Sequence, residues 1–178
     1  MMIAIRRMQN PEIERIAEID RSEHITKTYV NNDGSLEARD VDWQVPPWSR
    51  DGQHEHSIRA RIEEWRPLLE GGCAMFGAFD DGNLVGFVIY CPNLSKDTAQ
   101  LAALYVSKNY RKQGVGALLT DKVKQLAKAD GAKKLYVSAT PTAPTVHFYM
   151  DQGFELTREI NQWLYELEPD DIHMIKIL

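Results

Sequence analysis

The stretch Leu101-Ala102-Ala103-Leu104-Tyr105-Val106, followed closely by Arg111-Lys112-Gln113-Gly114-Val115-Gly116, decides the fold of this chain. The first run is short and apolar, as a buried strand is, and the second leads into a helical stripe that begins at Leu119. A helix N-terminus offers unpaired N–H groups and a partial positive charge, and the two glycines let a ligand approach the backbone closely. The sequence therefore predicts an anion-binding loop between a strand and a helix, of a size that suits a pyrophosphate.

Two other phosphate loops do not fit this stretch. A Walker A loop needs Gly-Lys followed by Ser or Thr, whereas Gly116 is followed by Ala117-Leu118. A dinucleotide fingerprint needs a third glycine where this chain has Leu119, and it belongs in a parallel sheet. The strands before the loop are expected to be antiparallel. Taken alone, the loop fits a pyrophosphate site and a glycine-containing turn with solvated charges equally well.

The elements outward from the loop form one continuous pattern, with no repeat or linker, and predict a single domain over residues 1–178. Upstream we expect a strand over 3–8 and then a helix, opened by Pro11, with Ile13, Ile16 and Ile19 on one face. A hairpin over 25–43 follows, with its turn at Asn32-Asp33-Gly34. After it we expect a helix with the apolar stripe Ile58, Ile62, Trp65 and Leu69, and a pair of strands over 74–79 and 84–90. Downstream we expect a strand over 134–138, a helix over 142–152 with Gly153 at its end, and a set of strands over 154–178.

Composition limits the classes of protein. The chain is 43% hydrophobic and 26% charged, which is typical of a globular protein, and no segment has the roughly 20 apolar residues that a membrane span needs. The net charge of −5 argues against nucleic acid as the main partner. Cys73 and Cys91 lack neighbours at metal-ligand spacing, so we expect two buried thiols and no metal. No secretory signal is recognisable, and a cytoplasmic location is the default expectation.

The surroundings of the loop resemble the GNAT superfamily of N-acetyltransferases. The phosphate signature of that family is Arg or Gln, two residues, Gly, one residue, then Gly or Ala, which Arg111, Gly114 and Gly116 match. Its later signature, a Phe-Tyr pair shortly before Gly-Phe, is matched by Phe148-Tyr149 and Gly153-Phe154. The resemblance implies an α+β GNAT fold, with a mixed and mostly antiparallel central sheet flanked by helices. The hairpin near residues 25–45 is then an insertion into the usual pattern.

The resemblance also implies how acetyl-CoA is held. In the family, the strand before the loop splays from the next strand, and its backbone pairs with the pantetheine arm as it would with another strand. An N–H near Leu104 could in addition polarise the thioester carbonyl. The residues expected at the cofactor are Leu104, Tyr105, Val106, Arg111, Lys112, Gln113, Gly114, Val115, Gly116, Thr142 and Phe148.

Tyr149 stands where the family commonly places the general acid that protonates the departing thiolate. The general base is open, because the strand Gln100–Tyr105 lacks the acidic residue that many relatives carry there. The other candidates are Glu23, His24, Asp42, the cluster His54-Glu55-His56, or a chain of water molecules. Thr142 and Thr145 replace the family's usual asparagine and alanine, and Thr142 is expected to cap its helix.

The function implied by the resemblance is acetyl-CoA-dependent acetylation of a primary amine of a small molecule or peptide. A protein lysine acetyltransferase and a non-catalytic acetyl-CoA sensor are the alternatives, and a homodimer is left open. The hairpin mixes aromatic and acidic side chains, which would suit a cationic amine or could simply fold the hairpin onto the core. These side chains are Tyr29, Trp43 and Trp48 with Asp33, Glu37, Asp40, Asp42 and Asp51.

Overall fold

The protein is described from a computed structural model that covers residues 2–178. Its strands are β1 (Ala4–Met8), β2 (Glu23–Asn32), β3 (Ser35–Val45), β4 (Ala74–Asp80), β5 (Asn83–Ser95), β6 (Thr98–Val106), β7 (Lys134–Ala139), β8 (Glu155–Leu156) and β9 (Ile172–Ile177). Its helices are α1 (Ile58–Glu70), α2 (Val115–Ala129), α3 (Ala143–Asp151) and α4 (Gln162–Leu167), with 3-10 helices η1 (Asn10–Glu18) and η2 (Lys108–Tyr110).

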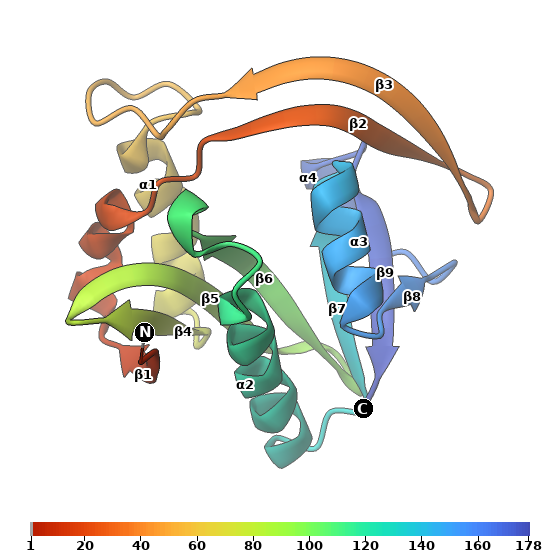
Figure 1. The fold of residues 1–178 in the computed structure, drawn as a ribbon. Coiled ribbons are helices and arrows are strands. Elements are labelled where there is room, and N and C mark those ends of the chain that lie inside the picture. The colour runs from red at the N-terminus through yellow and green to blue at the C-terminus, as the bar shows by residue number, and fades with distance from the viewer. Residues whose placement is uncertain (1) are drawn as a thin grey trace.

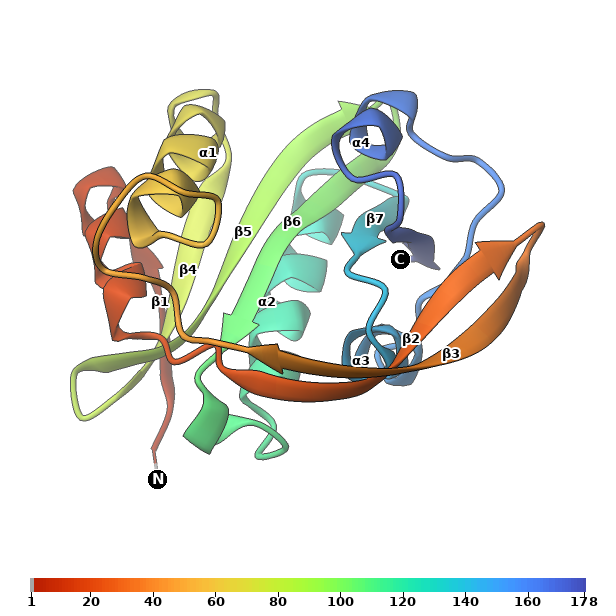
Figure 2. The same cartoon turned by 90° about the horizontal axis from the view of Figure 1, so that it is seen from above.

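A seven-stranded sheet runs through the molecule in the order β1-β4-β5-β6-β7-β9-β8. All its neighbouring strands are antiparallel except β6 and β7, which are parallel. The helices η1 and α1 cover one face, and α2 and α3 cover the other (Figures 1 and 2). The α+β fold with a mixed, mostly antiparallel sheet is therefore confirmed.

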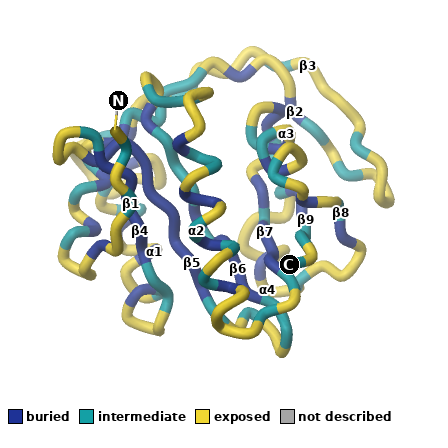
Figure 3. Tube along the Cα trace, turned by 60° about the horizontal axis from the view of Figure 1, so that its bottom comes forward, coloured by how far each residue is buried: buried dark blue, intermediate teal, exposed yellow. Residues whose placement is uncertain are grey.

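Each face of the sheet has its own hydrophobic core, because side chains alternate along the central strands. On β5, Phe87 and Ile89 pack toward η1 and α1, whereas Val88 and Tyr90 pack toward α2. The central strands β4 and β5 are the most buried part of the trace in Figure 3. Their burial holds β6, which carries the predicted cofactor edge, in a fixed place.

The predicted hairpin is confirmed as a separate two-stranded ribbon, β2 and β3, that arches away from the main sheet (Figure 1). Its turn residues Asp33 and Gly34 have φ of 56° and 91°, which a two-residue hairpin turn of this twist requires. Tyr29 fastens the ribbon to the far side of the molecule. Its N–H donates to Pro141 O at 2.7 Å, and its hydroxyl lies 2.7 Å from Nε2 of His147 on α3.

Two elements differ from the predictions. The first helix, η1, is a 3-10 helix. Its buried residues Ile13 and Ile16 are three residues apart, which is one full turn of a 3-10 helix, so both face the core. The prediction of strands throughout 154–178 is wrong over residues 162–167, where α4 forms. Asn161 caps it, because its side chain accepts a hydrogen bond of 3.1 Å from Leu164 N–H.

The prediction of two thiols is also wrong, because Cys73 and Cys91 form a disulfide. Ala74 pairs with Tyr90 in the register of β4 and β5, so the two cysteines face one another just beyond that pair. The two cysteines are 18 residues apart in the sequence, a separation that belongs to no short cysteine motif, so the sequence did not indicate the pair.

Removing this disulfide is expected to lower the free energy of unfolding by roughly 3 kcal/mol, as for closure of a loop of this length. Thermal unfolding with and without dithiothreitol checks this, with the Cys73→Ser/Cys91→Ser variant as the control that must not respond to reductant. An unchanged Tm in wild-type protein would contradict the cross-link.

No helix within residues 2–178 is both long enough and apolar enough to cross a membrane.

Candidate active site

The strand β6 has a backbone edge with no strand partner over its second half. Its pairing with β7 covers only Thr98 to Gln100, opposite Lys134 to Tyr136, and no other strand among residues 2–178 pairs with that side of β6. Beyond Gln100 the two strands diverge. The splay expected from the family resemblance is thus present.

The register with β5 shows which backbone groups face this open edge. Ser107 N–H donates to Val85 O at 2.9 Å, and hydrogen-bonded positions alternate along an antiparallel pair. Tyr105 therefore bonds to β5, whereas Leu104 and Val106 turn their N–H and C=O groups toward the opening. A peptide-like arm could pair with these groups as a strand would.

The predicted anion loop lies directly after this edge. Lys112 and Gly114 both have left-handed backbone, with φ of 59° and 86°, and such alternation turns successive N–H groups toward one concave side. The first hydrogen bond of α2 runs from Leu118 N–H to Gly114 O at 3.0 Å, so the N–H groups of residues 115–117 have no acceptor within the helix. The loop has the backbone donors that a pyrophosphate needs.

The second glycine of the loop allows a close contact. A Cβ built on Gly116 would lie 3.1 Å from the ring of Phe148 on α3 and 3.7 Å from Cγ2 of Val106. The sequence-predicted residues Gly116, Phe148 and Val106 are therefore brought together between the two helices.

Four predicted residues have side chains that are engaged within the protein. Arg111 donates from Nε to Val106 O at 3.0 Å and from Nη1 to Ser22 O at 3.1 Å, so its guanidinium ties the loop to β6 and to the start of the ribbon. Gln113 bonds back to Asn109 O at 2.7 Å, and Val115 is buried in the core. Thr142 occupies the N-cap position, but its hydroxyl bonds to Thr145 Oγ1 at 3.0 Å, so the expected side-chain cap does not form.

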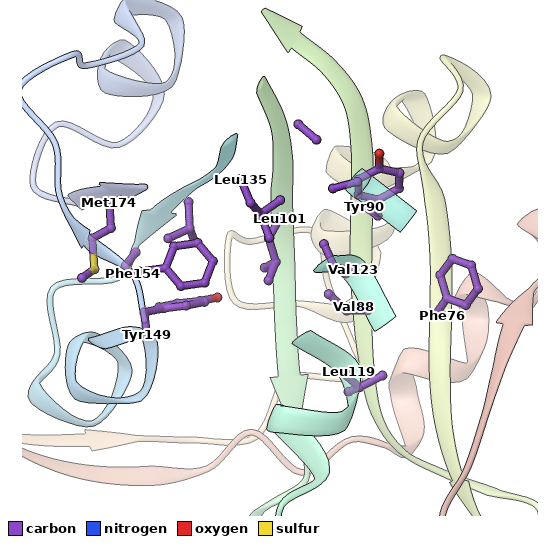
Figure 4. Close-up of a cluster of buried hydrophobic side chains, with 14 of the residues drawn as sticks. Phe76, Val88, Tyr90, Leu101, Leu119, Val123, Leu135, Tyr149, Phe154 and Met174 are labelled. Atoms are coloured by element: carbon purple, nitrogen blue, oxygen red, sulfur yellow. The ribbon is translucent and has the colours of Figure 1, made fainter. Parts of the chain in front are cut away.

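Tyr149 extends from α3 toward Leu101 and the central strands, with its hydroxyl at the leading end (Figure 4). Its ring packs edge-on against Phe148 and Phe154, at centroid distances of 5.3 and 5.4 Å. Burial raises the pKa of the phenol, with smaller contributions from Tyr105 and Asp171, so the hydroxyl keeps its proton at neutral pH.

The side chain of Tyr105 points to the other face of the sheet, where it joins an aromatic platform of Trp48, Trp65 and Tyr105. The ring centroids of Trp48 and Trp65 lie 4.8 and 5.6 Å from that of Tyr105 and 6.0 Å from one another. Trp48, which the sequence placed with the ribbon, is thus part of this platform. The platform lies across the sheet from the α2 loop, as a second substrate entering the open edge from the opposite face would require.

Two arginines lie on this platform. The guanidinium carbon of Arg21 is 5.6 Å from the Trp48 centroid, and that of Arg61 is 5.9 Å from the Trp65 centroid. Burial lowers the pKa of Arg21, and the neighbouring Arg61 lowers it further. Burial raises the pKa of Tyr105, which the two guanidinium groups partly offset. Sequence reasoning missed both arginines.

Asp171, which directly precedes β9, was also missed. Its Oδ2 accepts a hydrogen bond of 2.9 Å from Ser138 Oγ on β7, at the far side of the opening. Burial raises the pKa of its carboxyl group to about 6. The hydrogen bond from Ser138 opposes this rise, whereas the negative charges of Glu168 and Asp170 add to it. Asp171 also makes a small contribution to the raised pKa of both phenols, Tyr105 and Tyr149.

The base candidates taken from the sequence lie on the ribbon and on the loop before α1. His24 Nε2 and Asp42 Oδ1 face one another across the ribbon at 2.7 Å, with side chains 50% and 86% exposed. His56 and Glu55 pair at 3.3 Å and are similarly exposed. These groups are largely solvated, whereas Asp171 is partly buried beside the opening.

Comparisons with a family model and with curated proteins both match this chain to acetyltransferases. Residues 38–154 match the family model described as "Acetyltransferase (GNAT) family". Among curated proteins, an amino-acid acetyltransferase of Azotobacter vinelandii is 32% identical over 95 residues, which are 53% of this chain and 21% of that protein. The match thus spans about a fifth of the length of that relative.

Solved structures share the fold over almost the whole chain. Nourseothricin acetyltransferase is 21% identical with a TM-score of 0.70, covering 98% of this chain and 96% of its own. The PaiA N-acetyltransferase of Thermoplasma acidophilum, in complex with coenzyme A, is 19% identical with a TM-score of 0.62 and full coverage of both chains.

Proposed function

The chain belongs to the acetyltransferase (GNAT) family, and from this premise we propose that it transfers the acetyl group of acetyl-CoA to a primary amine. The observation that carries the proposal is the open edge of β6 leading directly into the donor-rich N-terminus of α2. Together they offer strand-like pairing for a pantetheine arm and backbone N–H groups for a pyrophosphate.

Two parts of acetyl-CoA, the pantetheine arm and the pyrophosphate, have candidate residues. Leu104 offers both backbone groups to the pantetheine arm, whereas Val106 offers its N–H, since its carbonyl already accepts from Arg111. The N–H groups of residues 113–117, with the exposed Lys112, would hold the pyrophosphate. Acetyl-CoA, when bound, supplies the acetyl thioester.

Tyr149 and Asp171 are the acid and the base of the proposal. Asp171 takes one proton from the acceptor ammonium and later releases it to solvent. The amine nitrogen then bonds to the acetyl carbon as the carbon–sulfur bond breaks, and Tyr149 protonates the sulfur. The second proton leaving nitrogen restores the Tyr149 phenol, so the products are amide, thiol and one solvent proton.

The direct test is thiol release from acetyl-CoA across a panel of amines, together with calorimetric binding of acetyl-CoA. Wild-type protein is expected to bind acetyl-CoA and to release thiol only with an acceptor amine. Failure to bind acetyl-CoA would refute the proposal. Binding with no thiol release for any amine would instead favour a non-catalytic sensor.

Gly114→Ala is expected to weaken acetyl-CoA binding about tenfold, because a side chain at this left-handed position strains the turn that orients the loop N–H groups and would disturb at least one hydrogen bond to phosphate. Gly131→Ala, at the other end of α2, is the matched control: φ is +82° there and +86° at Gly114, and neither Cβ would meet another atom within 4 Å. Both variants should lose about 1–2 kcal/mol of stability from left-handed strain. Equal acetyl-CoA affinity in the two variants would contradict a phosphate site at Gly114.

A further inference from the structure

The aromatic platform holds hydrogen-bond donors that the protein does not satisfy. Three buried side-chain nitrogen or oxygen atoms lack a hydrogen-bond partner within residues 2–178, and two of them, Trp48 Nε1 and Arg61 Nε, are on this platform. Both are N–H donors, since neither an indole nor a guanidinium accepts a hydrogen bond. Unsatisfied buried groups are rare in native proteins, so this pair calls for a ligand rich in acceptors.

The charges on the platform point to the same kind of ligand. Within residues 2–178, Arg61 has one ion-pair partner, Glu64, with Nη1 and Oε2 2.7 Å apart, and Glu64 is about half exposed. Among the same residues, Arg21 bonds only to a neutral carbonyl, Pro46 O, at 3.1 Å. The two guanidinium groups thus have a single carboxylate partner there, and the charge of Arg61 contributes to the lowered pKa of Arg21.

An opposite charge, Asp171, is held by Ser138 on β7, across the opening from β6. Arg21 and Arg61 lie over Trp48 and Trp65, whose rings pack against Tyr105. All three charges act on the pKa of the Tyr105 phenol, which the arginines lower and Asp171 raises. A ligand above Tyr105 would meet donors at one end and a proton acceptor at the other. Tyr149 lies in the core on the α2 side of the sheet and extends from α3 toward Leu101 on β6 (Figure 4).

Resting on the acetyl transfer proposed above, we propose that the acceptor is a small amine with a carboxylate a few bonds away, as in a free α-amino acid, and that Arg21 and Arg61 bind this carboxylate. The planar guanidinium forks match carboxylate geometry, and the Trp48 N–H adds a further donor. The amine end then lies toward Asp171, with the apolar part of the acceptor beside Tyr105, the ring of the platform that is not fully buried. A polyamine would instead bring positive charge onto two arginines.

The test compares the kcat/KM of α-amino acids with that of their C-terminal amides in the thiol-release assay. The amide keeps the side chain and the amine but lacks the negative charge, and its amine is less basic, so a preference for the acid cannot come from a larger fraction of free amine. We expect wild-type protein to prefer the acid by roughly 100-fold, as for loss of a buried charge partner.

Arg61→Gln and Arg21→Gln should each lose at least about tenfold of this preference, mainly through KM for the acid, with little change for the amide. Arg61→Lys keeps the positive charge but loses the planar guanidinium group, so its preference for the acid should lie between that of the glutamine variants and that of wild type. Arg59→Gln is the matched control, because Arg59 is on the same helix, pairs with Glu63 and is 63% exposed, and it should behave as wild type. Tm and the Kd for acetyl-CoA are measured for every variant.

The outcomes separate this proposal from the function on which it rests. If no amine gives thiol release, acetyl transfer itself fails. If amines without a carboxylate, including amides, polyamines or peptide lysines, are acetylated as well as α-amino acids are, acetyl transfer stands and the carboxylate site is overturned. An acid preference that survives in both glutamine variants, with Tm and acetyl-CoA affinity intact, overturns the assignment of Arg21 and Arg61.

Discussion

Replacing Tyr149 with phenylalanine is expected to lower kcat by about 100- to 1000-fold, while the Kd for acetyl-CoA stays unchanged. The ring would still pack against Phe148 and Phe154, and only the proton donor at its tip would be lost. Because burial raises the pKa of this phenol, the wild-type rate should show no loss from its ionisation up to about pH 10. Stopped-flow or steady-state thiol release measures the effect.

Tyr90→Phe provides the control for this change. Tyr90 lies in the same hydrophobic core, and its hydroxyl donates to Asp130 Oδ2 at 2.7 Å, away from the open edge of β6. Its loss should lower stability by about 1 kcal/mol and leave kcat unaltered. A kcat for Tyr149→Phe within a few-fold of wild type would mean that Tyr149 serves packing alone.

Asp171→Asn is expected to lower kcat/KM about 100-fold at pH 8, because asparagine keeps the shape and can still bond to Ser138 but cannot take a proton. The wild-type profile of kcat/KM should rise with pH through about 6, as the carboxyl group with its raised pKa loses its proton. This rise should be absent in the variant. Asp170→Asn, one residue away and exposed, is the matched control. It should keep the rise, moved slightly to lower pH, because the Asp170 charge contributes to the raised pKa of Asp171.

The Asp171→Asn substitution should also raise the stability of the folded protein at pH 8. The folded-state pKa of Asp171, about 6, lies above the value of about 3.9 expected in the unfolded chain. The fold therefore favours the protonated form, and its stability declines as pH rises from about 4 to about 6 and stays lower above that. Neutral asparagine removes this penalty, so Tm at pH 8 should increase while activity falls. A lower Tm accompanied by lost activity would instead indicate misfolding.

Local sequence predicted most of the proposed acetyl-CoA site. Gly114 at a strand-to-helix junction favours a left-handed turn, and Asp33-Gly34 favours a tight hairpin turn in the same way. Apolar periodicity then assigned the central strands and the helices α1 and α2, because each has to bury one face. The prediction of Tyr149 as the acid came from the resemblance to the GNAT family, which Phe148-Tyr149 and Gly153-Phe154 carry.

Only the tertiary structure brings together the residues of the proposed acceptor site. Strand β9 pairs between β7 and β8, and this places Asp171 beside Ser138, although no local pattern links the two. Arg21 and Arg61 meet only because Trp48, Trp65 and Tyr105 pack together from three separate segments, and Cys73 meets Cys91 only through strand register. Backbone turns and the apolar faces of helices and strands depend on residues that are close in the sequence, so they can be predicted from it. Charges that gather around a buried ring come from distant parts of the chain, and their pKa values depend on a burial that exists only in the folded protein.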